Sequence, residues 1–143
     1  MTCRPFETAR TPIFAFSLSL MACCAASAAE APPADLVKLR SAFAAAVAAK
    51  DIKALAGLSR FPLTNQVYQA PVKISRAGFA QSIVANGYWG ESDCLRKAPL
   101  ERDVTKNKTK ASWFVACDQG NNIFHFVHDG GRWAYGGFEN VGE

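Results

Sequence analysis

The spacing of apolar residues is helical in the first half of the chain and strand-like in the second. Between Asp35 and Lys50, bulky apolar residues recur every three or four positions, which predicts an amphipathic helix. Asp51 can cap a second short helix, because its carboxylate can accept hydrogen bonds from first-turn amides. Ser75 is expected to cap a third helix and Gly87 to end it. The apolar stripe of the first helix consists of Leu36, Leu39, Phe43 and Val47.

Strands are predicted where apolar and polar residues alternate along the chain with a period of two. After the second helix, Arg60 to Leu63 cannot continue as helix and is expected to turn towards the sheet. A short strand is expected at Val72 to Ile74, and the stretch from Tyr88 to Cys94 is expected to be irregular. Strands that follow one another closely leave no room for a crossover helix, so the later ones should pair as an antiparallel meander. The predicted later strands are Leu100–Thr105, Ser112–Asp118, Ile123–His128 and Arg132–Phe138, with a polar turn at Lys106 to Lys108.

This order of elements predicts an α+β fold in which N-terminal helices pack on one face of a curved antiparallel sheet. Four features then resemble the nuclear transport factor 2-like (cystatin-like) superfamily over residues 34 to 140. They are the first helix with its phenylalanine, Phe61-Pro62-Leu63, the stretch from Ile74 to Phe79, and the stretch from Gly131 to Phe138.

The resemblance implies a cone of helices and bent sheet that encloses a cavity. Some relatives are ketosteroid isomerases, dehydratases or cyclases, and many others are binding or assembly modules, so the fold does not select an activity. Relatives often dimerise through the outer face of the sheet, which makes a homodimer plausible by analogy.

The first 28 residues have the pattern of a secretory signal peptide. Arg4 and Arg10 precede an apolar run of about a dozen residues, which is too short to cross a bilayer, and Ala26-Ser27-Ala28 follows as a cleavage site. Residues 29–34 then form a proline-containing linker, and 35–143 a single domain without a transmembrane span. We therefore expect a periplasmic or secreted protein. The alternative is a lipoprotein anchored at Cys23, because the box from Leu20 to Cys23 resembles a lipidation site.

Five cysteines are present, but only Cys94 and Cys117 lie beyond the leader. In an oxidising compartment such a pair is most simply a disulfide. A redox pair or half of a metal site are the alternatives, although no second pair of ligands stands at metal spacing and no Cys-x-x-Cys occurs. We therefore expect no metal and no cofactor.

Three residues are candidates for acid–base chemistry. His125 lies between apolar neighbours on one face of its predicted strand, so it is either a general base or a core histidine. Tyr135 could present a hydroxyl to a cavity, and Asp103 with Glu101 could form an acid pair facing the cone or a solvated face. None matches a family catalytic pattern, so no catalytic residue is assigned.

Aromatic residues at alternate strand positions provide a candidate ligand site. Trp113 lies on the same face as Cys117, and Trp133 and Tyr135 share a face with Gly137. Such rings can line a pocket or pack between sheet and helices.

The chain has a formal net charge of +4, of which Arg4, Arg10 and Glu7 contribute +1, so the exported part carries about +3. This charge is too sparse for a nucleic-acid domain. A locally basic stretch between Arg96 and Lys110 either meets an acidic partner or deters edge-to-edge aggregation. No phosphate loop, nucleophile elbow or zinc-protease motif is present.

The main hypothesis is an exported module that binds a small ligand or a protein partner. The first alternative is a small lyase or isomerase that transfers a proton in an apolar cavity through His125, Tyr135 or Asp103. The second is an inhibitor or immunity protein for an envelope enzyme. An open cavity with an acid or histidine beside a tyrosine favours the enzyme, whereas a cavity filled by aromatic side chains favours the module.

Overall fold

The computed structural model describes residues 30–67, 70–104 and 112–142. The predicted signal peptide, Cys23 and the predicted turn at Lys106 to Lys108 lie outside these ranges. The helices are α1 (Ala34–Ala48), α2 (Ile52–Gly57), α3 (Phe79–Ala85) and α4 (Ser92–Lys97), with short 3-10 turns η1 (Tyr88–Gly90) and η2 (Asp118–Gly120). The strands are β1 (Ser59–Val67), β2 (Val72–Ile74), β3 (Glu101–Arg102), β4 (Ser112–Cys117), β5 (Asn122–Asp129) and β6 (Arg132–Asn140).

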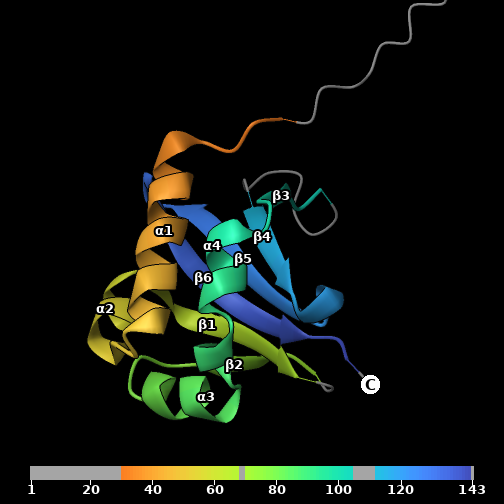
Figure 1. Ribbon diagram of the computed structural model, residues 1–143. Coiled ribbons are helices and arrows are strands. Elements are labelled where there is room, and N and C mark those ends of the chain that lie inside the picture. Colours follow the sequence, from red (N-terminus) through yellow and green to blue (C-terminus); the bar gives the residue numbers. More distant parts are fainter. Residues whose placement is uncertain (1–29, 68–69, 105–111, 143) are drawn as a thin grey trace, which may run out of the picture.

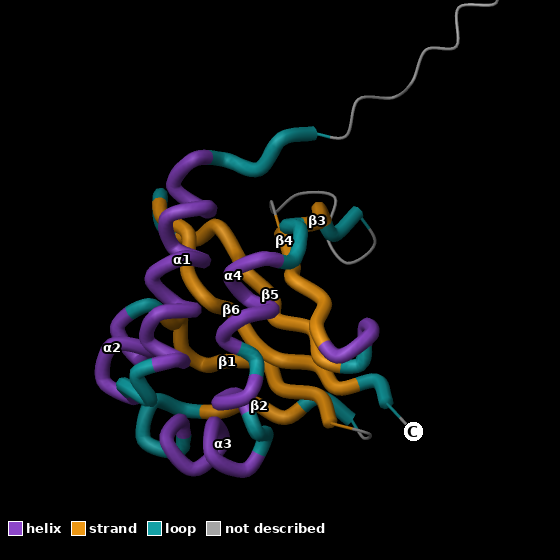
Figure 2. Tube along the Cα trace, viewed as in Figure 1, coloured by secondary structure: helices purple, strands orange, loops and turns teal. Residues whose placement is uncertain are grey.

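The six strands form one curved sheet in the order β2-β1-β6-β5-β4-β3, with the helices gathered on one of its faces (Figures 1 and 2). The predicted α+β class is confirmed, and β4, β5 and β6 form the expected antiparallel meander. The sheet is mixed rather than wholly antiparallel, because β1 pairs with β6 in parallel. A parallel pair needs a long connection between its strands, and here two helices, α3 and α4, and four strands separate β1 from β6.

Strand β1 corrects the expectation that Arg60 to Leu63 only turns towards the sheet. Proline lacks the amide that a ladder requires, so Pro62 indicated a turn. The strand accommodates it because the β1–β6 register shifts between Ser59 and Thr64, which leaves Pro62 outside the regular ladder. The Phe61–Pro62 peptide bond is cis.

Two other local predictions need correction. Helix α3 begins at Phe79 rather than after Ser75, whose hydroxyl instead accepts a hydrogen bond from the Gly78 amide at 3.3 Å. The segment predicted to be irregular up to Cys94 contains η1 and the start of α4. The predicted stop at Gly87 is confirmed, since this residue adopts a φ of +68° just after α3.

Helices α1 and α2 follow the sequence pattern closely. Leu36, Phe43 and Val47 of the predicted stripe are fully buried against the sheet. The predicted cap at Asp51 is confirmed, because its carboxylate accepts the Ala54 amide at 2.9 Å. No helix within the described ranges is long and apolar enough to cross a membrane.

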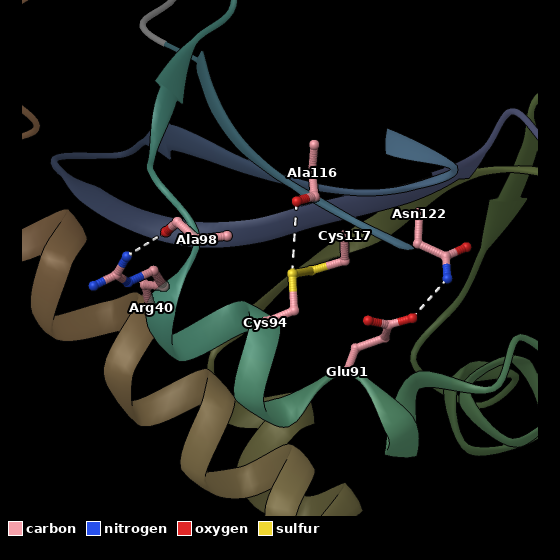
Figure 3. The surroundings of a disulfide bond; sticks show 7 residues. All are labelled: Arg40, Glu91, Cys94, Ala98, Ala116, Cys117 and Asn122. Carbon is pink, nitrogen blue, oxygen red and sulfur yellow. Dashed lines mark hydrogen bonds between the residues drawn. A yellow bond between two sulfur atoms is a disulfide. The ribbon is translucent and has the colours of Figure 1, made fainter. Parts of the chain in front are cut away.

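The predicted disulfide is confirmed: Cys94 in α4 is bonded to Cys117 at the end of β4, with 5.8 Å between their Cα atoms. The bond ties a short helix of six residues to the sheet. Arg40 of α1 holds the other end of α4, because its guanidinium donates to the Ala98 carbonyl oxygen at 2.9 Å (Figure 3).

Reduction of this disulfide should lower the melting temperature. The bond closes a loop with a sequence separation of 23 residues, so its loss should cost about 3 kcal/mol and about 10 °C. Differential scanning calorimetry with and without a dithiol reductant, in the presence of a metal chelator, measures the shift. The Cys94→Ser variant should have the same melting temperature as the reduced wild-type protein, and the reductant should not change it. An unchanged melting temperature of the wild-type protein after reduction would contradict the prediction.

Candidate functional site

Aromatic side chains fill the space between the helices and the sheet, where the resemblance implied a cavity. Phe43 of α1 lies at the centre, with its ring centroid 5.8 Å from that of Phe126 and 4.5 Å from that of Tyr135. Each ring of this interior cluster is at most 2% exposed. The interior cluster consists of Phe43, Tyr88, Phe124, Phe126, Tyr135 and Phe138.

Tyr135, predicted to offer its hydroxyl to a ligand, is instead sealed inside this cluster. Its hydroxyl lies 2.6 Å from that of Tyr88, so the two hydroxyls are hydrogen-bonded to each other. Burial raises the pKa of both phenols well above the ordinary value, because the charged form would lose its hydration. Its hydrogen bond with Tyr135 and, to a smaller extent, the side chains of Asn65 and Asn86 partly offset the rise in the pKa of Tyr88. Both hydroxyls therefore remain protonated at neutral pH and do not serve as bases.

The two tryptophans of the predicted ligand site also have packing roles. Trp113 is 2% exposed and belongs to the core. Trp133 is half-buried at the start of β6, where its ring packs edge-on against His128 with 5.1 Å between centroids. Trp113, Trp133 and Tyr135 are therefore not gathered around a common hollow.

His125 and Asp103 lie on the opposite, outer face of the sheet, where they line the same groove. This outer groove has a volume of about 310 Å³ and runs across β1, β6, β5 and β4. The Nε2 atom of His125 lies 3.2 Å from the Oε2 atom of Glu139, and each of these two side chains is less than one-fifth exposed. Asp103 is only 9% exposed, whereas Glu101, proposed as its acid partner, is exposed. The other lining residues include Arg60, Thr64, Gln66 and Ser112.

An irregularity in β6 decides which side chains reach this groove. The register between β5 and β6 shifts after His125, so Tyr135 and Phe138 both face the interior although three positions separate them. Gly137, predicted to share a face with Tyr135, instead lines the outer groove, and Glu139 follows it there. Strict alternation of period two therefore gave the wrong face for Gly137.

A second hollow of about 350 Å³ extends the outer groove towards β3. It is more apolar, with Phe114 of β4 and Ile123 of β5 beside His125, and Val104 at its rim is 73% exposed. Arg102 supplies a positive charge at this end. The outer face thus combines half-buried apolar side chains with charges of both signs.

A third hollow, of about 420 Å³, lies between the β1–β2 hairpin and α3. Its polar lining is neutral: Asn65 donates to the Ser82 hydroxyl at 2.7 Å, and Asn86 donates to the same oxygen at 3.2 Å. The Asn65 side chain also accepts the Phe138 amide at 3.3 Å, so its amide group is already engaged on both sides. This hollow holds no ionisable side chain among its described lining residues.

The fold and site define an α+β domain with a filled interior and a mixed-charge groove on the outer face of its sheet. No protein-family model and no curated protein matches the chain. It is similar to solved structures, and those named below are distant in sequence. Among them are an NTF2-like protein with a cystatin-like fold from Novosphingobium aromaticivorans (19% identity, 74% of this chain and 78% of that chain, TM-score 0.42) and an NTF-2 like protein of unknown function from Shewanella oneidensis (11% identity, 73% and 94%, TM-score 0.41). A CaMKII hub from S. rosetta shares 16% identity over 80% of this chain and 98% of that chain, with a TM-score of 0.45.

Proposed function

We propose that this protein is an exported interaction module that acts through the outer face of its sheet, and that a second copy of the same chain occupies this face. The observation that carries the proposal is the division between the two faces. Aromatic rings fill the inner side, whereas the outer side is hollowed and bears the ionisable side chains. The leader supports export, and the disulfide fits an oxidising compartment.

The composition of the outer face supports a protein partner. Stable interfaces combine an apolar centre with a polar rim that supplies hydrogen bonds. Phe114, Ile123 and Val127 provide half-buried apolar area there, and exposed Val104 adds to it. In the described part of the chain, all four helices lie on the other side of the sheet (Figure 1).

The balance of charge favours a second copy as the partner. A two-fold interface brings the same surface against itself, so a face of one sign would repel its copy. Here the carboxylates of Asp103 and Glu139 lie in the same groove as the guanidinium of Arg60. Arg60 pairs with Asp129 at 2.8 Å at the end of β5, so both signs also occur at the rim.

The same arrangement does not favour proton transfer in an apolar cavity. That hypothesis placed an acid or histidine beside a tyrosine in one open site. The sheet instead separates Tyr135 on its inner face from His125 and Asp103 on its outer face.

Sedimentation velocity tests the proposal. We expect the wild-type protein to sediment as a dimer, and Phe114→Arg to sediment as a monomer because it places a large charge in the apolar part of the outer face. Val84→Arg is the matched control, since Val84 lies on α3 and is 62% exposed, so this variant should remain dimeric. Circular dichroism checks that each variant is folded. A monomeric wild-type protein, or a folded dimeric Phe114→Arg variant, would contradict the proposal.

A further inference from the structure

The disulfide has a carboxylate beside it that sequence spacing did not reveal. Glu91 immediately precedes α4, one helical turn before Cys94, so the two side chains lie on the same side of the chain. A carboxylate oxygen of Glu91 and the Sγ atoms of Cys94 and Cys117 all lie within 4.8 Å of one another. Figure 3 shows this group between α4 and the ends of β4 and β5.

Two asparagines hold the Glu91 carboxylate in place. The Asn122 side-chain amide donates to Oε1 of Glu91 at 2.7 Å, and the Asn140 amide donates to the Asn122 side-chain oxygen at 2.6 Å. The chain of hydrogen bonds fixes which way the Asn122 amide faces. In metal sites, hydrogen bonds of this kind orient the side chains that ligate the ion.

We propose that reduction of the Cys94–Cys117 bond creates a site for one thiophilic divalent cation of the Zn²⁺ class, held by both sulfurs and the Glu91 carboxylate. A dithiol reductant supplies two electrons and two protons and is itself oxidised to a disulfide, which leaves two thiols on the protein. The cation then displaces both thiol protons and binds two thiolates and one carboxylate. Disulfide and metal are mutually exclusive, so the site depends on the redox state.

Charge and access suit this ligand set. Two thiolates and a carboxylate place three negative charges together, which is unfavourable without a cation and favourable around one. Zinc accepts thiolate and carboxylate ligands, and zinc sites with three protein ligands keep a water in the fourth position. Cys117 is buried, whereas Cys94 and Glu91 are half-buried, so an ion can reach the group from solvent.

Cadmium titration tests the site, because Cd²⁺ is a zinc analogue whose bonds to thiolates absorb in the ultraviolet. The chain is used with Cys3, Cys23 and Cys24 replaced by serine, so that only the bonded pair remains. After reduction with dithiothreitol and its removal under argon, we expect one Cd²⁺ per chain, with displacement by Zn²⁺. The oxidised protein should give no charge-transfer absorption. A reduced protein without this absorption would overturn the proposal.

Two variants, each of which removes one carboxylate, distinguish direct ligation by Glu91 from a general effect of negative charge on Cd²⁺ affinity. Glu91→Gln keeps the shape of the side chain and should weaken Cd²⁺ binding at least tenfold, or about 1.4 kcal/mol. Glu101→Gln removes an exposed carboxylate from β3 and should leave the affinity unchanged. Equal affinity of Glu91→Gln and wild-type protein would exclude Glu91 as a ligand. If Glu91→Gln does not fold, Asn122→Ala provides the second variant, and it should weaken binding because the carboxylate loses its orienting amide.

Discussion

Replacing Phe43 by alanine should lower the free energy of unfolding by about 3–5 kcal/mol, since this is the usual cost of removing a buried phenylalanine. The side chain is fully buried at the centre of the interior cluster, and its ring contacts Phe124, Phe126 and Tyr135. Truncation removes this apolar area from the core and leaves a cavity that the surrounding strands cannot fill completely. Urea unfolding followed by tryptophan fluorescence measures the change.

Val84→Ala is the control for this substitution. Val84 is 62% exposed on α3, so its truncation should change the free energy of unfolding by no more than about 0.5 kcal/mol. If Phe43→Ala cost as little as this control, the interior would not be the filled core on which the proposed function depends.

Replacing Gly137 by alanine should lower the free energy of unfolding by about 3 kcal/mol or more, because close approach of the chain and strain act together. A Cβ atom at this position would lie 2.0 Å from the Thr64 carbonyl oxygen, which belongs to the backbone of β1 and cannot rotate away. The residue also has a φ of +157°, a backbone conformation that residues other than glycine rarely adopt. The β1–β6 pairing should therefore open.

Hydrogen exchange identifies where this damage occurs. Amides of β1 around Thr64 should lose protection in Gly137→Ala, whereas those of the β4–β5 pair should retain it. Gly57→Ala is the matched control, because a Cβ there meets nothing within 4 Å and the residue ends α2. This control should be neutral or stabilised by up to about 1 kcal/mol. Equal stabilities of the two variants would contradict the predicted clash.

The elements that the sequence predicted correctly are those with a strong local pattern. Helix α1 has a stripe of four bulky residues, and β4, β5 and β6 alternate between turns rich in glycine and asparagine. Strand β1 was missed because Pro62 interrupts its pattern. Helix α4 was missed because six residues give too little periodicity to identify a helix.

The candidate site was predicted only in part. His125 and Asp103 were named from their residue types and strand positions, and both line the outer groove. Glu139 was missed, although its carboxylate lies beside the His125 imidazole. It follows the register shift in β6, so strict alternation could not place it on the same face as His125. Glu91 was missed because it reaches Cys117 only through the packing of α4 on β4.

By itself, the sequence determined the fold class, the helix stripe, the meander and the Cys94–Cys117 pair, because each depends on spacing along the chain or on a count of thiols. The tertiary structure decided that aromatic rings fill the interior, that β1 runs parallel to β6, and that Tyr135 and His125 lie on opposite sides of the sheet. These features depend on contacts between residues far apart in the sequence. One register shift or one bulge changes the face of the sheet on which a side chain lies, and the alternation of apolar and polar residues does not predict where such a shift occurs.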